Sequence, residues 1–286
     1  MRSSARNSLT DFLSEEAIAL RLSVSGKDRN SGTGQMRRIF IGDLHLQDSR
    51  PDITEGFIRF IREECLRCDE LYILGDLFEA WIGDDERADL SERVAWELQR
   101  LRRPGKFFIR GNRDFLIGKE FCALAGLTLL PDISEVRLGR SSAVILHGDL
   151  LCTADKKYQK YRKTVSNHFL QKCFLALPIS IRKRIAAGMR KKSRSANSVK
   201  PFELMEVSDS EVLKIMTARQ CSVMIHGHTH RPLIKDYNTE IFQANSLYLP
   251  ARRYVVGAWD KEFKYVRADG DEVKLITARL DGRYAL

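Results

Sequence analysis

Five short apolar segments, each followed at once by a polar residue, are the feature that most constrains the fold of this chain. They are RRIFIGD (37–43), ELYILGD (70–76), KFFIRGN (106–112), SAVILHGD (142–149) and CSVMIHGH (221–228). Two segments with helical spacing, 56–66 and 92–101, lie between the first three. Short apolar strands that alternate with helices are typical of parallel strands buried in an α/β core.

The end of the chain follows another pattern. The segments 252–260, 262–268 and 271–280 are joined by short turns, and Asp269-Gly270 occupies the last turn. Asp-Gly between two apolar runs is a strong signal for a β-hairpin. We therefore predict an antiparallel meander here and, for the whole chain, mixed sheets with helices outside them.

Side chains that can bind a metal follow each of the five apolar segments. They are Asp43 and His45, then Asp76, Asn112 and His147, and finally the histidines of MIHGHTH (224–230), which holds three of the six in the chain. Ligands of α/β proteins gather where strands end at their carboxyl side, so we expect these side chains to meet. An Asp after a glycine is often only a turn or a helix cap, but turn chemistry does not explain five such segments in order.

The residue types restrict the metal. Two Asp, one Asn and several His, without Cys, combine hard oxygen with imidazole, which suits Mn²⁺, Fe or Zn²⁺ better than Ca²⁺ or an iron–sulfur cluster. Seven side chains are too many for one ion and fit two ions that share a carboxylate. Paired ions about 3.5–4 Å apart stabilise the attacking and leaving oxygens of an in-line displacement, so the sequence predicts di-metal phosphoester chemistry.

One segment carries the basic character of the chain. The formal net charge is +10, and residues 156–200 hold 14 Lys and Arg but no Asp or Glu. Pro178 suits the first turn of a helix in which Ile181, Ile185 and Met189 share one face. We expect a helical insert between two core strands that meets an anionic partner, which is a lipid headgroup, a nucleotide or a nucleic acid.

The beginning of the chain, its short apolar runs and its scattered cysteines suggest a cytoplasmic protein. Residues 1–35 end in a flexible polar linker, and Met36 opens the first strand as a candidate start residue. The beginning of the chain lacks the apolar core of a secretory signal, and no apolar run approaches the ~20 residues of a membrane helix. Cys65 and Cys68 form the one C-x-x-C, so we expect six scattered free thiols rather than a zinc site.

The motifs GD-x-H, GD, GN-x-D, HGD and GH-x-H occur in this order, and with them the chain resembles the calcineurin-like metallophosphoesterase superfamily. GDLFEAWIGDD (75–85), GNRDFLIG (111–118), HGDLLCTAD (147–155) and HGHTHRP (226–232) narrow the resemblance to the UDP-2,3-diacylglucosamine pyrophosphatases of lipid A biosynthesis. It implies an α/β fold, an αββα sandwich of two mixed sheets flanked by helices. The core would be 36–150 and 201–286, with a basic amphipathic helical cap at 151–200 and a flexible N-terminal extension at 1–35.

The resemblance also assigns the metal ligands. One Mn²⁺ would be held by Asp43, His45, Asp76 and His230, and a second Mn²⁺ by Asp76, Asn112, His147 and His228. Catalytic roles would fall to Asp76, Asn112, Arg113 and His228. Gly227 would let the backbone turn tightly beside the site, and we expect the remaining histidine, His226, to support the ligands rather than bind metal.

Arg113 stands where the wider superfamily usually has His. A planar, permanently charged guanidinium suits phosphate oxygens but not general-acid catalysis, so we expect a leaving group that departs without protonation, as in a pyrophosphate. A structural ion pair between Arg113 and Asp114 is an alternative that is compatible with this role.

The resemblance places the substrate between the core and the cap. Contacts would come from Asn112, Arg113, Asp155, Ser193, Asn197, Lys200 and His228. FLALPI (174–179) and the face of Ile181, Ile185 and Met189 would line a groove for acyl chains. An acid-free segment with apolar stripes also suits a helix on an anionic bilayer, so we expect peripheral attachment to the cytoplasmic side of the inner membrane.

These expectations combine into one reaction, the hydrolysis of UDP-2,3-diacylglucosamine at the α-phosphorus to UMP and 2,3-diacylglucosamine 1-phosphate, with two Mn²⁺ per chain. One alternative is a metallophosphoesterase that acts on another nucleotide or on a nucleic-acid phosphodiester. The apolar FLALPI and the few aromatic residues near the cations argue against it, so we expect no nucleic-acid partner and predict no protein partner. A non-catalytic protein that keeps the fold is a second alternative, but all seven ligand positions are filled.

Overall fold

The computed structural model describes residues 35–199, 206–282 and 284–285, and the side chains of residues 35–190 and 206–282. Residues Gln35–Leu286 form one compact unit. Of the predicted substrate contacts, the side chains of Ser193 and Asn197 lie outside the described side chains, and Lys200 lies outside the described residues. Residues 1–34 of the predicted extension also lie outside the described residues.

The first sheet has the strand order β12-β11-β10-β1-β2-β3-β4. Its parallel part consists of β1 (Arg37–Ile41), β2 (Glu70–Leu74), β3 (Gly105–Ile109) and β4 (Thr128–Leu129). An antiparallel part consists of β10 (Glu262–Asp269), β11 (Glu272–Arg279) and β12 (Tyr284–Ala285). The first three predicted strands are therefore neighbours in one sheet.

The second sheet has the strand order β5-β6-β7-β9-β8. Its strands are β5 (Ile133–Leu138), β6 (Ser141–Leu146), β7 (Val223–His226), β8 (Leu233–Phe242) and β9 (Tyr248–Val255). β7 runs parallel to both β6 and β9, whereas β5 and β8 pair antiparallel at the two edges. The last two predicted core strands therefore belong to a different sheet from the first three.

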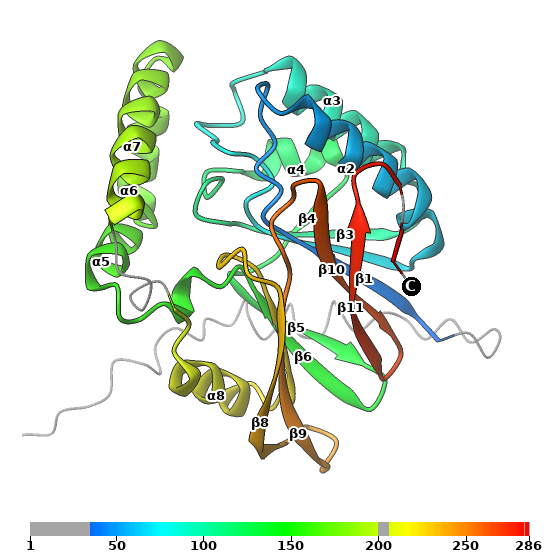
Figure 1. Cartoon of the computed structure of the whole chain (residues 1–286). Coiled ribbons are helices and arrows are strands. Elements are labelled where there is room, and N and C mark those ends of the chain that lie inside the picture. Colours follow the sequence, from blue (N-terminus) through cyan, green and yellow to red (C-terminus); the bar gives the residue numbers. More distant parts are fainter. Residues whose placement is uncertain (1–34, 200–205, 283, 286) are drawn as a thin grey trace, which may run out of the picture. The chain divides into compact units, whose positions relative to one another are not determined.

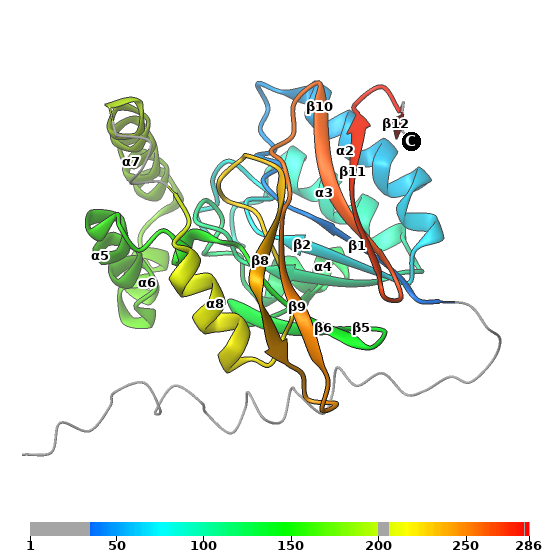
Figure 2. The same ribbon diagram turned by 60° about the horizontal axis from the view of Figure 1, so that its bottom comes forward.

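Helices cover the outer faces of the two sheets (Figures 1 and 2). α2 (Pro51–Glu63), α3 (Asp89–Arg100) and α4 (Lys119–Ala125) pack on the first sheet, where Phe57 and Val94 are buried against Ile39. α8 (Asp209–Ala218) packs on the second sheet through Val212 and Met216.

Apolar side chains of the two sheets form a further core between them. Phe40, Tyr72 and Ile145 belong to this cluster, and the Tyr72 ring stacks on that of Phe40 with 4.9 Å between the ring centroids. The residues of the parallel strands are buried on both faces for this reason, which explains why they read as continuous apolar runs. The αββα arrangement of two mixed sheets with flanking helices is confirmed.

The predicted three-stranded meander at the end of the chain is wrong in its first strand. β10 and β11 form the expected hairpin, and Gly270 adopts a positive φ of 58° in its turn. β9, however, pairs with β7 and β8 in the other sheet. Tyr254 and Val256 bury their side chains between the two sheets, so residues 256–261 carry the chain from one sheet to the other instead of closing a turn.

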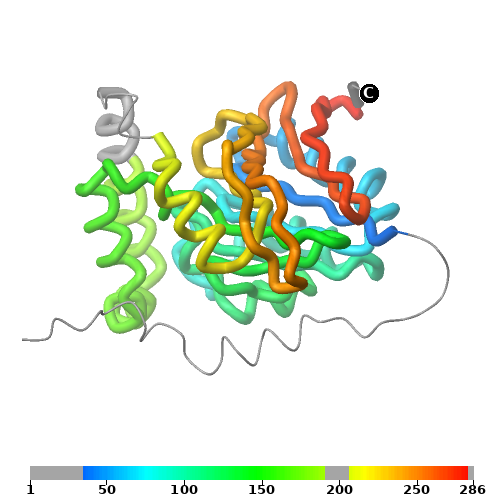
Figure 3. The backbone as a smooth tube through the Cα atoms, turned by 90° about the horizontal axis from the view of Figure 1, so that it is seen from below, coloured from blue at the N-terminus to red at the C-terminus, as the bar shows by residue number. Residues whose placement is uncertain are grey.

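The basic insert forms three helices that lie beside one another, away from the two sheets (Figures 1 and 3). They are α5 (Lys156–Val165), α6 (His168–Leu175) and α7 (Ile179–Val199), and Pro178 directly precedes α7 as predicted. The helical part of the cap predicted at 151–200 thus spans residues 156–199, and from here on the cap means these residues. Its charges are not all solvated, because Arg182 is buried and donates to the carbonyl of Ile82 over 2.7 Å and to the carboxylate of Asp85 over 2.8 Å.

Candidate metal centre

The carboxyl ends of five strands, three from the first sheet and two from the second, meet at one site. The loops after β1, β2 and β3 come from the first sheet, and those after β6 and β7 come from the second. These loops carry all seven predicted metal ligands, and the structure brings the seven side chains together although Asp43 and His230 are separated by 187 positions.

One group of ligand atoms contains Asp43, His45, Asp76 and His230. Each residue offers one nitrogen or carboxylate oxygen, and these atoms all lie within 4.8 Å of one another. The Nε2 atoms of His45 and His230 are 3.0 Å apart, and Nε2 of His45 is 3.6 Å from Asp76 Oδ2. Asp43 and Asp76 are fully buried, whereas His230 is exposed.

A second group contains Asp76, Asn112, His147 and His228. Asn112 Oδ1 lies 3.0 Å from Nε2 of His147 and 2.8 Å from Nδ1 of His228. The second oxygen of Asp76, Oδ1, lies 3.8 Å from Nε2 of His147. Asp76 thus presents one oxygen to each group, which is the arrangement of a carboxylate shared by two ions.

The donor set fits divalent cations. Within each group two imidazole nitrogens face each other, at 3.0 Å for His45 and His230 and at 3.2 Å for His147 and His228. Metal–nitrogen bonds of about 2.0–2.1 Å place two ligand atoms of one cation at such a separation. Oxygen and imidazole donors without thiolate suit Mn²⁺, Fe or Zn²⁺.

The backbone at the centre occupies an uncommon conformation. Asp43, His45, Asp76, His228 and His230 all have positive φ, between 51° and 71°. Non-glycine residues rarely adopt such values, which cost of order 1–3 kcal/mol each and cluster at functional sites. Hydrogen bonds hold the conformation in place, since the N–H of Asp43 donates to the Gly75 carbonyl and that of His45 donates to the Asp76 carbonyl.

Burial perturbs the titration of several ligands. It raises the pKa of Asp43 to about 7, and it lowers the pKa of His228 to about 4. Burial also disfavours the charged form of His147, but Asp76 and Asp43 outweigh it and raise the pKa of His147 to about 9. The metal-free centre therefore retains protons that a cation displaces when it binds.

Neighbouring groups orient two of the imidazole rings. Nδ1 of His147 donates to the Leu74 carbonyl over 2.9 Å, and Nδ1 of His45 lies 3.0 Å from Glu79 Oε2. Both contacts leave Nε2 facing the centre. Sequence reasoning missed Glu79, because an acid in the run GDLFEAWIGDD has no spacing that sets it apart from its neighbours.

Arg113 faces the cavity in front of the centre, and its Nε is buried without an acceptor. Its backbone N–H donates to Asp76 Oδ1 over 2.8 Å. Among the described residues it forms no ion pair with Asp114, whose carboxylate instead accepts from the N–H groups of Gly111 and Leu77. The backbone hydrogen bond to Asp76 therefore holds Arg113 in place, and the Nε of its guanidinium remains available to a ligand.

His226 lies apart from the two groups. Its side chain is fully buried, and its Nδ1 donates to the Gly227 carbonyl over 2.8 Å. Burial lowers the pKa of His226 to about 3, which keeps the ring neutral. Gly227 does not adopt a positive φ. Glycine is required there for its lack of a side chain, because a Cβ would lie 2.6 Å from Asp43 Oδ2.

A cavity of about 1240 Å³ joins the metal centre to the cap. Its polar wall includes His45, Asp76, Asn112, His228 and His230. Its apolar wall is formed by side chains of the core and the cap, namely Trp81, Ile82, Phe115, Leu116, Val165, Leu170, Phe174, Ala186 and Met189. The cavity thus combines a phosphate-binding centre with a large apolar surface.

Some residues of the predicted substrate groove have other positions. Asp155 lines the cavity, but it also caps α5 by accepting from the N–H of Tyr158 over 2.9 Å. Met189 lines the cavity, whereas Ile181 and Ile185 lie outside its lining and are 42% and 38% exposed. The face predicted for α7 is therefore divided between the cavity and solvent.

Residues 36–232 match the sequence model of the Calcineurin-like phosphoesterase family. The chain belongs to this family. Two relatives called UDP-2,3-diacylglucosamine hydrolase, from Yersinia pseudotuberculosis serotype O:1b and Yersinia pestis bv. Antiqua, are each 47% identical to it over 247 residues, which cover 85% of this chain and 99% of the relative. The superfamily and the narrower resemblance predicted from the motifs are both confirmed.

Similar solved structures include a phosphoesterase from E. coli. It is 15% identical, with a TM-score of 0.42, over 88% of this chain and 97% of that chain. Membership of the Calcineurin-like phosphoesterase family, together with the group Asp43, His45, Asp76 and His230, implies that the centre holds divalent metal.

Proposed function

We propose that this calcineurin-like phosphoesterase hydrolyses the pyrophosphate bond of UDP-2,3-diacylglucosamine, giving UMP and 2,3-diacylglucosamine 1-phosphate. The observation that carries the proposal is the cavity in which the candidate metal centre adjoins the apolar wall of Trp81, Phe115 and Phe174. A phosphoesterase for a soluble nucleotide has no use for such a wall. The 47% identity to relatives called UDP-2,3-diacylglucosamine hydrolase supports the same substrate.

The proposed metal content is two Mn²⁺ per chain. Asp43, His45, Asp76 and His230 would hold one ion, and Asp76, Asn112, His147 and His228 the other. The ions would supply positive charge against the phosphoryl oxygens and acidify the attacking water. Asp76 would link the two ions, since its two oxygens face the two groups.

The residues around the centre have separate roles in this proposal. The guanidinium of Arg113 would neutralise charge on the phosphoryl oxygens, because Arg113 lines the cavity and its Nε has no acceptor. Asn112 and His228 would position the α-phosphate. No general acid is required, because the bridging oxygen leaves as part of a phosphate that is stable as an anion.

Isotope labelling tests the site of attack. The water oxygen is proposed to bond to the α-phosphorus while the bond from this phosphorus to the bridging oxygen breaks, and the bridging oxygen stays with the lipid phosphate. In oxygen-18 water the label is therefore expected in UMP and not in 2,3-diacylglucosamine 1-phosphate. Label in the lipid phosphate, or release of UDP in place of UMP, contradicts the proposal.

We also propose that the cap attaches the protein to the cytoplasmic side of the inner membrane. Among the described residues no helix has the length and apolar content needed to cross a bilayer. The cap exposes Phe169 (71%), Leu170, Ile181 and Ile185 within a segment that has no acidic residue. Such a surface binds anionic lipid through apolar insertion and charge together.

Vesicle binding tests the attachment. Wild-type protein is expected to sediment with vesicles that contain anionic lipid, and the double variant Ile181→Asp, Ile185→Asp to remain in the supernatant. Equal sedimentation of the two proteins contradicts the attachment and leaves the proposed hydrolysis untouched.

A further inference from the structure

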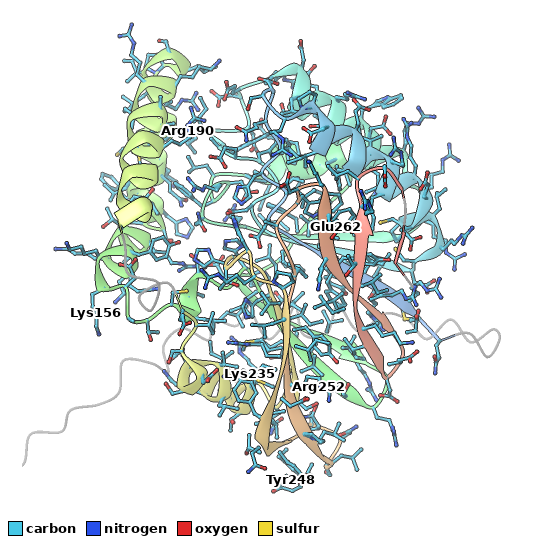
Figure 4. The ribbon with its side chains drawn as sticks, in the orientation of Figure 1. Lys156, Arg190, Lys235, Tyr248, Arg252 and Glu262 are labelled. Atoms are coloured by element: carbon cyan, nitrogen blue, oxygen red, sulfur yellow. The ribbon has the colours of Figure 1, made fainter. Side chains whose placement is uncertain are left out.

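The cavity also reaches β8 and β9, which lie apart from α7 (Figures 1 and 2). Two cross-strand pairs line it there: Leu233 opposite Val255, and Lys235 opposite Arg253. Figure 4 shows Lys235 on β8 and Arg190 on α7, well apart from each other. Both of these residues line the same cavity, so its two ends have different walls.

Arg253 is a buried cation with unused donors. It is 6% exposed, and neither its Nε nor its Nη1 has a hydrogen-bond acceptor. Asp209 lies 3.8 Å from Nη1, but its oxygens accept from Lys235 over 2.5 Å and from Tyr237 over 2.8 Å. An arginine cannot become neutral by losing a proton, and buried donors without acceptors are costly, so this site favours a ligand that supplies an acceptor oxygen.

A buried guanidinium nitrogen without an acceptor is uncommon in the lining of this cavity. Among the described residues that line it, only Arg113 and Arg253 have a buried guanidinium Nε without an acceptor. Arg113 stands beside the metal ligands, where phosphate oxygens are expected. Val255 pairs with His226, the last residue of β7, and Arg253 lies two residues, about 7 Å, further back along β9 from this end of the strand.

The orientation of the substrate in the cavity follows from the wall on the cap side and the wall formed by β8 and β9. This step rests on the proposed function. The apolar wall on the cap side, with Phe174 and Met189, suits acyl chains. With the α-phosphorus at the centre, the group on the opposite side of the scissile bond is the nucleoside. The wall formed by β8 and β9 therefore faces the uridine part of the substrate.

We infer that Arg253 recognises the uracil base, by donating a hydrogen bond to the carbonyl oxygen at ring position 4 while the ring lies against Leu233 and Val255. Uracil carries two carbonyl oxygens on a flat heterocycle, which matches a charged donor next to two aliphatic side chains. Cytosine has an amino group in place of one of these oxygens. A guanidinium that donates to that position accepts uracil and rejects cytosine, because two donors then face each other.

Binding of nucleoside monophosphates to the Mn²⁺-loaded protein, measured by calorimetry, tests this inference. The wild type is expected to bind UMP about tenfold or more tightly than CMP, the size expected for one charge-assisted hydrogen bond. Arg253→Met is expected to weaken UMP binding about tenfold and to bring the two affinities together. Arg253→Lys, which keeps the charge and shortens the donor, is expected to lower the UMP preference too, and it is the variant to use if Arg253→Met does not fold.

Arg252 provides the matched control. It is the neighbouring arginine on β9, labelled in Figure 4, and it pairs with Asp236. Its half-exposed side chain does not line the cavity. Arg252→Met is expected to leave both affinities unchanged. If the Arg253 variants keep the wild-type UMP preference, or lose UMP and CMP affinity in equal measure, the base contact is refuted.

The inference and the proposed function fail separately. If the wild type does not release UMP from UDP-2,3-diacylglucosamine, the proposed function is wrong. If the wild type releases UMP and the Arg253 variants still prefer UMP to CMP, only the uracil contact is wrong.

Discussion

Nε2 of His45 lies 3.0 Å from Nε2 of His230, although 185 positions separate the two residues in the chain. His45 follows the end of β1 in one sheet, and His230 follows the end of β7 in the other. Two imidazole nitrogens held this close, in backbone conformations with positive φ, need a reason. A shared divalent cation supplies it, because the cation turns a costly arrangement into a set of bonds.

Asp76→Ala should remove activity more completely than His226→Ala. Asp76 presents an oxygen to each group of ligands, so its loss should empty both positions and lower UMP release by at least about 100-fold. His226 lies behind the ligands, and its loss should reduce activity by less while metal remains. UMP release and bound Mn²⁺ are to be measured on both variants. If His226→Ala is equally inactive and has lost its metal, the ligand assignment is wrong.

Gly227→Ala should weaken Mn²⁺ binding without changing any ligand. The new Cβ would lie 2.6 Å from Asp43 Oδ2, so the carboxylate must move. A titration with Mn²⁺ should show at least about tenfold lower affinity, the size of effect known for groups that orient metal ligands. Gly188→Ala is the control, since nothing lies within 4 Å of a Cβ there and alanine favours the helix. Equal affinities of the two variants would refute the tight packing of Gly227 on Asp43.

The metal-free protein should lose stability between pH 7 and pH 9. Although burial opposes the charge on His147, Asp76 and Asp43 raise its pKa to about 9, well above the usual value for histidine. In this window the folded state therefore binds more protons than the unfolded state, so the free energy of unfolding falls as pH rises. Bound Mn²⁺ should remove this slope, because the ligand is then already deprotonated.

Thermal unfolding at pH 7, 8 and 9, with and without Mn²⁺, measures this effect. His147→Gln should flatten the metal-free curve, whereas the exposed His168→Gln should leave it unchanged. A metal-free protein that is as stable at pH 9 as at pH 7 contradicts the raised pKa of His147.

Arg182→Ala should loosen the cap. Arg182 is buried and donates to Asp85 and to the carbonyls of Ile82 and Leu177, so it connects α7 to the loop after β2. Loss of these bonds should cost about 1–3 kcal/mol and speed amide hydrogen exchange in α7. Lys183→Ala removes only the exposed ion pair with Glu86 and should cost less than about 1 kcal/mol. Unchanged exchange in α7 of the Arg182 variant would show that this contact does not hold the cap.

The sequence predicts the centre of this molecule better than its edges. Five of the parallel strands, namely β1, β2, β3, β6 and β7, are apolar runs followed closely by a glycine and a ligand, so the sequence predicts these strands and their ligands together, from Asp43 to His228. The prediction that β9 joins β10 and β11 is wrong, because an apolar run does not indicate which of two sheets it belongs to. Tyr254 pairs with Ile225, far away in sequence, and only burial between the sheets decides this.

Contacts made through the backbone or over long distances are also hidden from the sequence. Glu79 orients His45, and Asp114 supports the loops through N–H groups of Gly111 and Leu77, but neither role depends on a spacing. Arg253 lies in a tail with no recognisable motif. Its importance follows from burial and from missing acceptors, which only three-dimensional structure reveals.

Anomalous X-ray diffraction at the manganese edge, on crystals of the Mn²⁺-loaded protein, tests the two-metal centre most directly. We predict two peaks: one among Asp43, His45, Asp76 and His230, and one among Asp76, Asn112, His147 and His228, with Asp76 in contact with both. A single peak, or peaks away from these side chains, would contradict the account.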